Sequence, residues 1–178
     1  MIFEIEKDDV QKLSDGGLRE LVARLCEAEV ERAGFHRYAV TYGGDQDAAD
    51  GGIDVRISLP DGPLPTDFPF HRHTGFQVKQ PKMPKGELAT EIAPKQKPRP
   101  SLRELARLGG EYVVVTSGDD LADDKLSARQ QDLTGLIQQH SDYSGLAADF
   151  WDQNRLRSWV NRFPGVALWL RSQVGKNL

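Results

Sequence analysis

The sequence is poor in cysteine and has no long apolar run. Its one cysteine, Cys26, excludes an internal disulfide framework and is typical of a reducing compartment. We expect no membrane-spanning helix, because no run of about 18 apolar residues occurs. The first residues, MIFEIEKDDVQK, are charged and lack the apolar stretch of a signal peptide. These absences predict a cytoplasmic protein outside the membrane, with Cys26 buried on an apolar helix face.

The chain has the length and composition of one globular domain. It contains 178 residues, of which 38% are hydrophobic, enough to form a core. We therefore expect residues 1–178 to form a single domain.

Charge is unevenly spread along the chain. Residues 1–62 carry 14 Asp and Glu against 7 Lys and Arg, whereas residues 71–110 carry 9 Lys and Arg against 3 acids. Such a basic segment suits a phosphate backbone held near a metal site, but a solvated loop explains the charge equally well. The side chains expected to follow a DNA backbone, or to contact another domain or subunit, are Lys82, Lys85, Lys95, Lys97 and Arg99.

The hydrophobic periodicity predicts an alternation of helices and strands. Helices are expected at 16–34, 101–110, 121–140, 149–163 and 164–174, strands at 35–42, 52–59, 75–80 and 111–116, and an extended arm with one short helix at 80–100. Ser14 or Asp15 is expected to cap the first helix, and Ser101 with Glu104 has the spacing of a capping box. This order predicts an α/β fold with a small mixed central β-sheet flanked by helices.

Two of the predicted strands alternate apolar and polar side chains. The apolar sets are Ile53, Val55, Ile57 and Leu59 in one strand, and Phe76 and Val78 in the other. The opposite faces then present Asp54, Gln77 and Lys79 at one place. A solvated sheet face with incidental polar residues is the alternative explanation.

These polar side chains are the donors that a hydrolytic metal site requires. The Asp54 carboxylate, the Gln77 amide oxygen and the backbone carbonyl of Val78 suit Mg²⁺ or Mn²⁺. Lys79 supplies a cation that assists a water molecule or neutralises a phosphate. A second carboxylate is expected from Glu20 on the first helix, where a surface position explains it equally well. Alternative acids are Asp45, Asp47 and Asp50.

The segments DGGIDV and FQVK resemble the PD-(D/E)xK nuclease superfamily in its D…QxK variant. The chain looks most like Mrr-type restriction endonucleases, and is similar to the N-terminal nuclease effector domains of bacterial antiphage proteins. The resemblance implies a restriction-endonuclease-like fold with Asp54 as the metal-binding acid and Lys79 as the catalytic lysine. It places Gln77 where many relatives have a carboxylate, and Glu20 as the helical acid that often completes the metal site.

The function implied by the resemblance is a Mg²⁺- or Mn²⁺-dependent DNA endonuclease in prokaryotic defence against foreign DNA. Double-stranded DNA is the expected substrate, and RNA stays open as an alternative. Cleavage with low sequence specificity is expected, because no sequence-reading motif is present. Expected partners are DNA and either a second copy of the chain or a fused or separate sensor domain. The alternative is a catalytically silent nuclease fold that binds DNA or protein, for which the uncharged Gln77 is the support.

Overall fold

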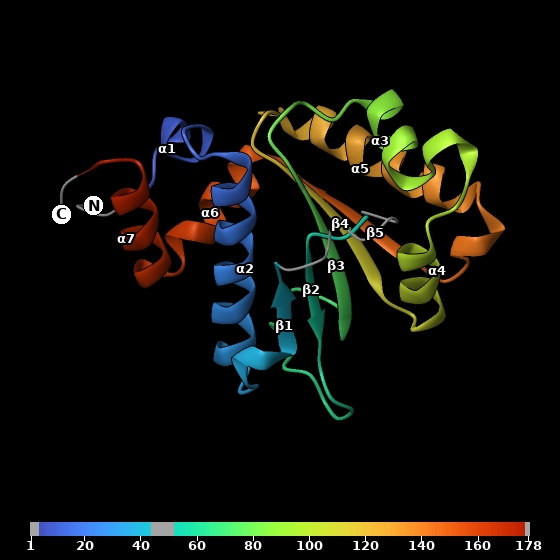
Figure 1. Ribbon diagram of the computed structural model, residues 1–178, viewed down its shortest axis with the longest axis horizontal. Helices are drawn as coiled ribbons and strands as arrows, with labels where there is room; N and C mark the ends of the chain where they lie inside the picture. The colour runs from blue at the N-terminus through green and yellow to red at the C-terminus, as the bar shows by residue number, and fades with distance from the viewer. Residues whose placement is uncertain (1–3, 44–51, 177–178) are drawn as a thin grey trace.

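The computed structural model describes residues 4–43 and 52–176, and a five-stranded β-sheet lies at its centre (Figure 1). The strands are β1 (Val40–Tyr42), β2 (Val55–Ser58), β3 (His73–Lys79), β4 (Glu111–Thr116) and β5 (Ala147–Trp151). The helices are α1 (Lys7–Gln11), α2 (Asp15–Arg32), α3 (Lys85–Ile92), α4 (Pro100–Arg107), α5 (Asp123–Gln138), α6 (Gln153–Asn161) and α7 (Pro164–Gln173), with 3₁₀ turns at Arg37–Ala39, Pro94–Gln96 and Ser141–Tyr143. Within the described ranges, no helix is long and apolar enough to cross a membrane.

The sheet is mixed, as the sequence predicts. Its spatial order is β1-β2-β3-β4-β5, with β1, β2 and β3 antiparallel and with β3, β4 and β5 parallel. The parallel connections pass through α3 and α4 and then through α5, because parallel neighbours require a long crossover. Strand β3 therefore lies at the centre, between an antiparallel and a parallel neighbour.

Two hydrophobic clusters cover the two faces of the sheet. Helices α1, α2, α6 and α7 pack on one side, here called the α2 face, and α3, α4 and α5 pack on the other, the α3 face (Figure 1). Every residue of β4 is buried, which confirms the interior strand predicted at 111–116. The mixed α/β architecture with helices on both faces is thus confirmed.

The predicted alternation holds on both strands except at one position. Val55 and Ile57 lie with Phe76 and Val78 in the cluster of the α2 face. Ile53 was expected beside them, but it packs against the cluster of the α3 face. The chain bends at Asp54 and β2 begins only at Val55, so the two-residue period does not extend back to position 53.

Local sequence features predicted several helix ends correctly. The Ser14 hydroxyl accepts a hydrogen bond from the Gly17 amide at 3.0 Å and caps α2. Gly34, with φ of +87°, follows the end of this helix in a conformation that favours glycine. Pro164 begins α7, as its fixed φ favours.

Three predicted elements were wrong in type or extent. Of the strand expected at 35–42, only Val40–Tyr42 is extended, because 37–39 form a 3₁₀ turn. The helix expected from 149 begins at 153, because the preceding residues form β5 beside β4. The capping box is absent: α4 begins at Pro100, and Glu104 pairs with Arg107.

Candidate functional site

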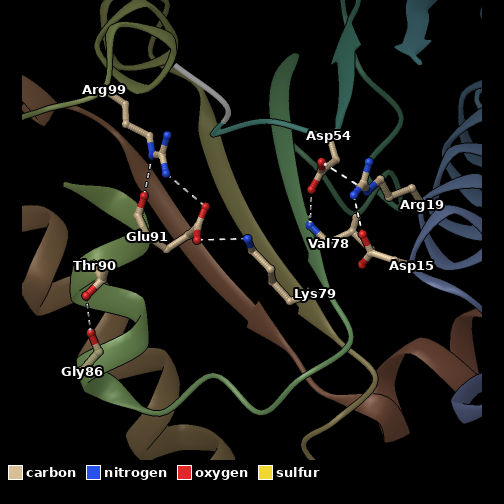
Figure 2. A network of polar contacts seen from close by, with 9 residues as sticks. All are labelled: Asp15, Arg19, Asp54, Val78, Lys79, Gly86, Thr90, Glu91 and Arg99. Carbon is tan, nitrogen blue, oxygen red and sulfur yellow. Dashed lines mark hydrogen bonds and ion pairs between the residues drawn. The ribbon is translucent and has the colours of Figure 1, made fainter. Parts of the chain in front are cut away.

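Asp54 lies at the bend before β2 and is bound to the backbone of β3 (Figure 2). Its amide donates to the Phe76 carbonyl at 2.7 Å, and its Oδ2 accepts from the Val78 amide at 2.8 Å. Its Oδ1 lies 3.6 Å from Nε of Arg19 on α2. Burial raises the pKa of Asp54 above its ordinary value, while the Val78 amide, Arg19 and Lys79 act to lower it. The carboxylate is therefore fixed beside the strand that carries the other candidates.

Gln77 and Lys79 project from β3 towards the α3 face, opposite Phe76 and Val78. The Gln77 side chain is 3% exposed, and its Oε1 has no hydrogen-bond partner among the described residues. A buried amide oxygen without a partner is costly. Gln77 Oε1 is thus a buried acceptor to which no donor of the described residues binds.

Lys79 is paired with a carboxylate that sequence reasoning missed. Its Nζ lies 3.0 Å from Oε2 of Glu91 on α3, and the other oxygen, Oε1, lies 3.3 Å from Nη2 of Arg99 (Figure 2). The Glu91 side chain is 14% exposed. Its neighbour in sequence, Ile92, is one of the two fully buried apolar residues of α3. An acid next to such a residue was the sequence signal that could have indicated Glu91.

The segment before Asp54 touches the same cluster. A Cβ added at Gly52 would lie 2.5 Å from Cδ of Arg99, so only glycine allows this approach without displacement. Arg99 is the side chain that Gly52 admits. The segment that leads to Asp54 therefore contacts Arg99, which in turn pairs with Glu91.

A second buried polar atom lies on the α3 face. Tyr112 of β4 is fully buried, and its hydroxyl has no hydrogen-bond partner among the described residues. Burial raises the pKa of this phenol well above its ordinary value, and the negative charge of Glu91 acts in the same direction. Because Tyr112 pairs with Gly75, it lies diagonally across the ladder from Gln77.

The carboxyl ends of β3 and β4 are tied together beyond Lys79. The Ser117 amide donates to the Lys79 carbonyl at 3.1 Å, and the Thr116 hydroxyl donates to the Pro81 carbonyl at 2.7 Å. A Cβ at Gly118 would lie 2.4 Å from the Gln80 carbonyl oxygen, so the two chain segments are in close contact. The backbone at and just after Lys79 is therefore held against the chain that follows β4.

Glu20 is paired with a neighbour on its own helix. Its carboxylate binds its helical neighbour Arg24, at 2.8 Å from Nη2, and the α2 side chain that reaches Asp54 is Arg19. The alternative acids, Asp45, Asp47 and Asp50, lie outside the described residues.

The five basic side chains predicted to follow DNA occupy two environments. Lys82, Lys95 and Lys97 are exposed, and Lys85 is exposed while lying 3.7 Å from Asp132. Arg99 differs, because its side chain is only 15% exposed and it turns inward to Glu91. The geometry thus separates four surface cations from one that belongs to the interior cluster.

Three oxygen donors on or beside β3 are of the type that a hard divalent cation binds. They are the Asp54 carboxylate, which accepts from the Val78 amide, the Gln77 amide oxygen, which has no partner among the described residues, and the backbone carbonyl of Val78. Over residues 4–43 and 52–176 there is no group of three or more His, Cys, Asp or Glu side chains that could hold a metal. A cation here would therefore rely on mixed oxygen donors rather than on a cage of carboxylates.

Comparison of the chain with protein-family models, curated proteins and solved structures gave no match. The chemistry of the site is therefore what points to a function.

Proposed function

We propose that the chain is a metal-dependent endonuclease with a restriction-endonuclease-like fold, acting on DNA. The observation that carries this proposal is the fixed position of Asp54 against the Val78 amide, at 2.8 Å, between Gln77 and Lys79 in β3. A carboxylate from the bend before β2 thus lies against β3, which carries an unpartnered amide oxygen and an amine. This set combines metal ligands with a cation for phosphate, as phosphodiester hydrolysis requires.

The side chains take distinct roles in this proposal. Asp54, Gln77 Oε1 and the Val78 carbonyl would hold Mg²⁺ or Mn²⁺, which when bound activates water and neutralises negative charge. Lys79 orients the attacking water or stabilises the phosphoryl oxygens with its charge. Glu20 would join this set only by leaving its ion pair with Arg24.

The exposed cations fit a phosphate backbone beside the site. Lys82 follows β3, and Lys95 and Lys97 follow α3, so all three are close in sequence to Lys79 or Glu91. Contacts of this kind bind nucleic acid without reading its sequence. Double-stranded DNA with low specificity is the proposed substrate, and antiphage defence by a chain that self-associates or joins a sensor is the setting that the resemblance suggests.

A second candidate function is a silent module that binds DNA or protein and promotes assembly. The observation that favours it is the absence of charge on Gln77, which leaves Asp54 as the anionic ligand of the proposed set. Titration with Mn²⁺ by calorimetry separates the two functions, because a silent site binds no metal whereas the nuclease does.

The test of the proposed function is cleavage of supercoiled plasmid in Mg²⁺ or Mn²⁺. We expect Asp54→Ala and Lys79→Ala each to lower the cleavage rate at least about 100-fold, the scale of removing a catalytic group. Asp61→Ala, at an exposed loop position, is the matched control and should keep the rate of the unsubstituted chain. Circular dichroism checks that each variant is folded. Equal cleavage by all the proteins, or none by the unsubstituted chain, would overturn the proposal.

A further inference from the structure

Glu91 divides its two carboxylate oxygens between two cations from different elements. Oε2 lies 3.0 Å from Nζ of Lys79 in β3, and Oε1 lies 3.3 Å from Nη2 of Arg99, which precedes α4 (Figure 2). All three side chains are less than one-third exposed. A partly buried pair is screened less by solvent than an exposed pair, so the contact restrains both side chains.

We propose that Glu91 is the positioning residue for Lys79, and that Arg99 anchors it. This inference rests on the proposed nuclease function, in which Lys79 is the catalytic amine. A lysine side chain has a flexible four-carbon stem and loses much rotamer freedom when its ammonium is held in one place. The Glu91 carboxylate supplies that restraint before a substrate arrives.

Several hydrogen bonds hold the backbone around Glu91. Arg99 also donates from Nε to the backbone carbonyl of Glu91 at 2.5 Å. It therefore binds both the main chain and the side chain of Glu91. The Arg99 amide donates to the Tyr143 hydroxyl at 2.7 Å, and that hydroxyl donates to the carbonyl of Ile92. The end of α3 is thereby tied to the chain before α4, which fixes the backbone from which the Glu91 carboxylate reaches Lys79.

The same contacts argue against Glu91 as a metal ligand. Its single negative charge is already shared by two positive charges, so the three side chains carry a net positive charge. Binding a divalent cation there would first require the loss of both ion pairs. Positioning of Lys79 requires no rearrangement.

The first experiment measures the exposure of the Lys79 amine directly. The full chain is treated with a limiting amount of an amine-acetylating reagent, and Lys79 acetylation is compared with that of exposed Lys97 by mass spectrometry. We expect Glu91→Gln to raise the Lys79 to Lys97 ratio about threefold, the factor that a modest ion pair represents. Glu91→Asp should give a smaller rise. Glu87→Gln, an exposed acid on the same helix, is the matched control and should give none.

The second experiment separates positioning from metal binding. We expect Glu91→Gln to lower the kcat of plasmid cleavage about 10- to 100-fold, the cost of a misplaced catalytic group, with KM for DNA unchanged. Mn²⁺ affinity by calorimetry should equal that of the unsubstituted chain, and Glu91→Asp should recover part of kcat. A fall in Mn²⁺ affinity as large as that of Asp54→Asn would make Glu91 a ligand and overturn the inference.

The outcomes test the positioning of Lys79 by Glu91 separately from the proposed nuclease function. An unchanged acetylation ratio in Glu91→Gln overturns the positioning role whether or not the chain cleaves DNA. A raised ratio in a chain that cleaves nothing supports the restraint on Lys79 and overturns the nuclease proposal.

Discussion

Two carboxylates on opposite faces of the sheet, Glu29 and Glu91, have different surroundings. On the α2 face, Glu29 is fully buried and binds the Trp159 indole at 3.0 Å, with Arg32 and Arg162 at 3.0 and 3.3 Å. On the α3 face, Glu91 is 14% exposed and holds Lys79 and Arg99. The first carboxylate joins one helix to another, whereas the second holds the cation of the candidate site.

The neighbours of the two carboxylates sharpen this difference. Trp159, which binds Glu29, belongs to an aromatic cluster whose ring centroids lie 5.0–6.2 Å apart and whose other members are Phe70, Phe76 and Trp151. On the α3 face, Gln77 Oε1 and the Tyr112 hydroxyl have no partner among the described residues. Packed aromatic rings stabilise a fold, whereas buried polar atoms left without partners call for a functional explanation.

The largest effect on stability is expected at the centre of the aromatic cluster. Trp159→Ala should lower the free energy of unfolding by about 3–5 kcal/mol, because it removes a large buried side chain and leaves a cavity. Tyr112→Phe, on the other face, should cost less than about 1 kcal/mol, because the hydroxyl that it removes has no partner. Urea denaturation followed by circular dichroism measures both. Similar losses in the two variants would contradict the difference between the faces.

A smaller effect is expected at the two carboxylates themselves. Glu29→Gln should cost about 1–3 kcal/mol, because charge-assisted bonds to Arg32, Arg162 and Trp159 are weakened in the interior. Glu91→Gln should cost less than about 1 kcal/mol, because Lys79 has access to water and Arg99 keeps its bond to the Glu91 carbonyl. The same denaturation measurement applies. If Glu91→Gln is the more destabilising, its carboxylate is structural and the comparison fails.

The smallest expected effect is a dependence of stability on pH at Asp54. Burial raises the pKa of this carboxyl, so the native state holds the proton to a higher pH than the unfolded chain does. Stability therefore falls as the pH rises through the native pKa, and the cost remains at neutral pH. Asp54→Asn should unfold at a higher temperature than the unsubstituted chain at pH 7.

The advantage of Asp54→Asn should disappear below about pH 4, where an ordinary aspartic acid is protonated. Asp61→Asn, at an exposed loop position, is the control and should show no such change. Thermal unfolding between pH 3 and 7 measures both, and a lower unfolding temperature for Asp54→Asn at pH 7 would contradict the expected sign.

Sequence alone predicted those parts of the fold and site that depend on local patterns. The helix predicted at 16–34, the strand predicted at 111–116 and the alternation of Phe76 and Val78 with polar residues each depend on residues close in the chain. The structure confirms them as α2, β4 and β3. The alternation also put Gln77 and Lys79 on the face opposite Phe76. Proximity of Asp54 to them was expected from the pairing of two neighbouring strands, and the Val78 bond shows that Asp54 contacts the backbone of β3 between these two residues.

Only the tertiary structure decided which distant residues complete these local patterns. The strand 147–151 forms because β4 offers it a parallel ladder, and nothing within its five residues required that. Arg99 turns inward because Glu91 and Gly52 meet it there, and Glu91 reaches Lys79 because α3 folds back over the sheet. The sequence determined which face of β3 is polar, because side-chain alternation is local. The tertiary structure decided which charge meets Lys79, because that contact depends on the path of the chain between strand and helix.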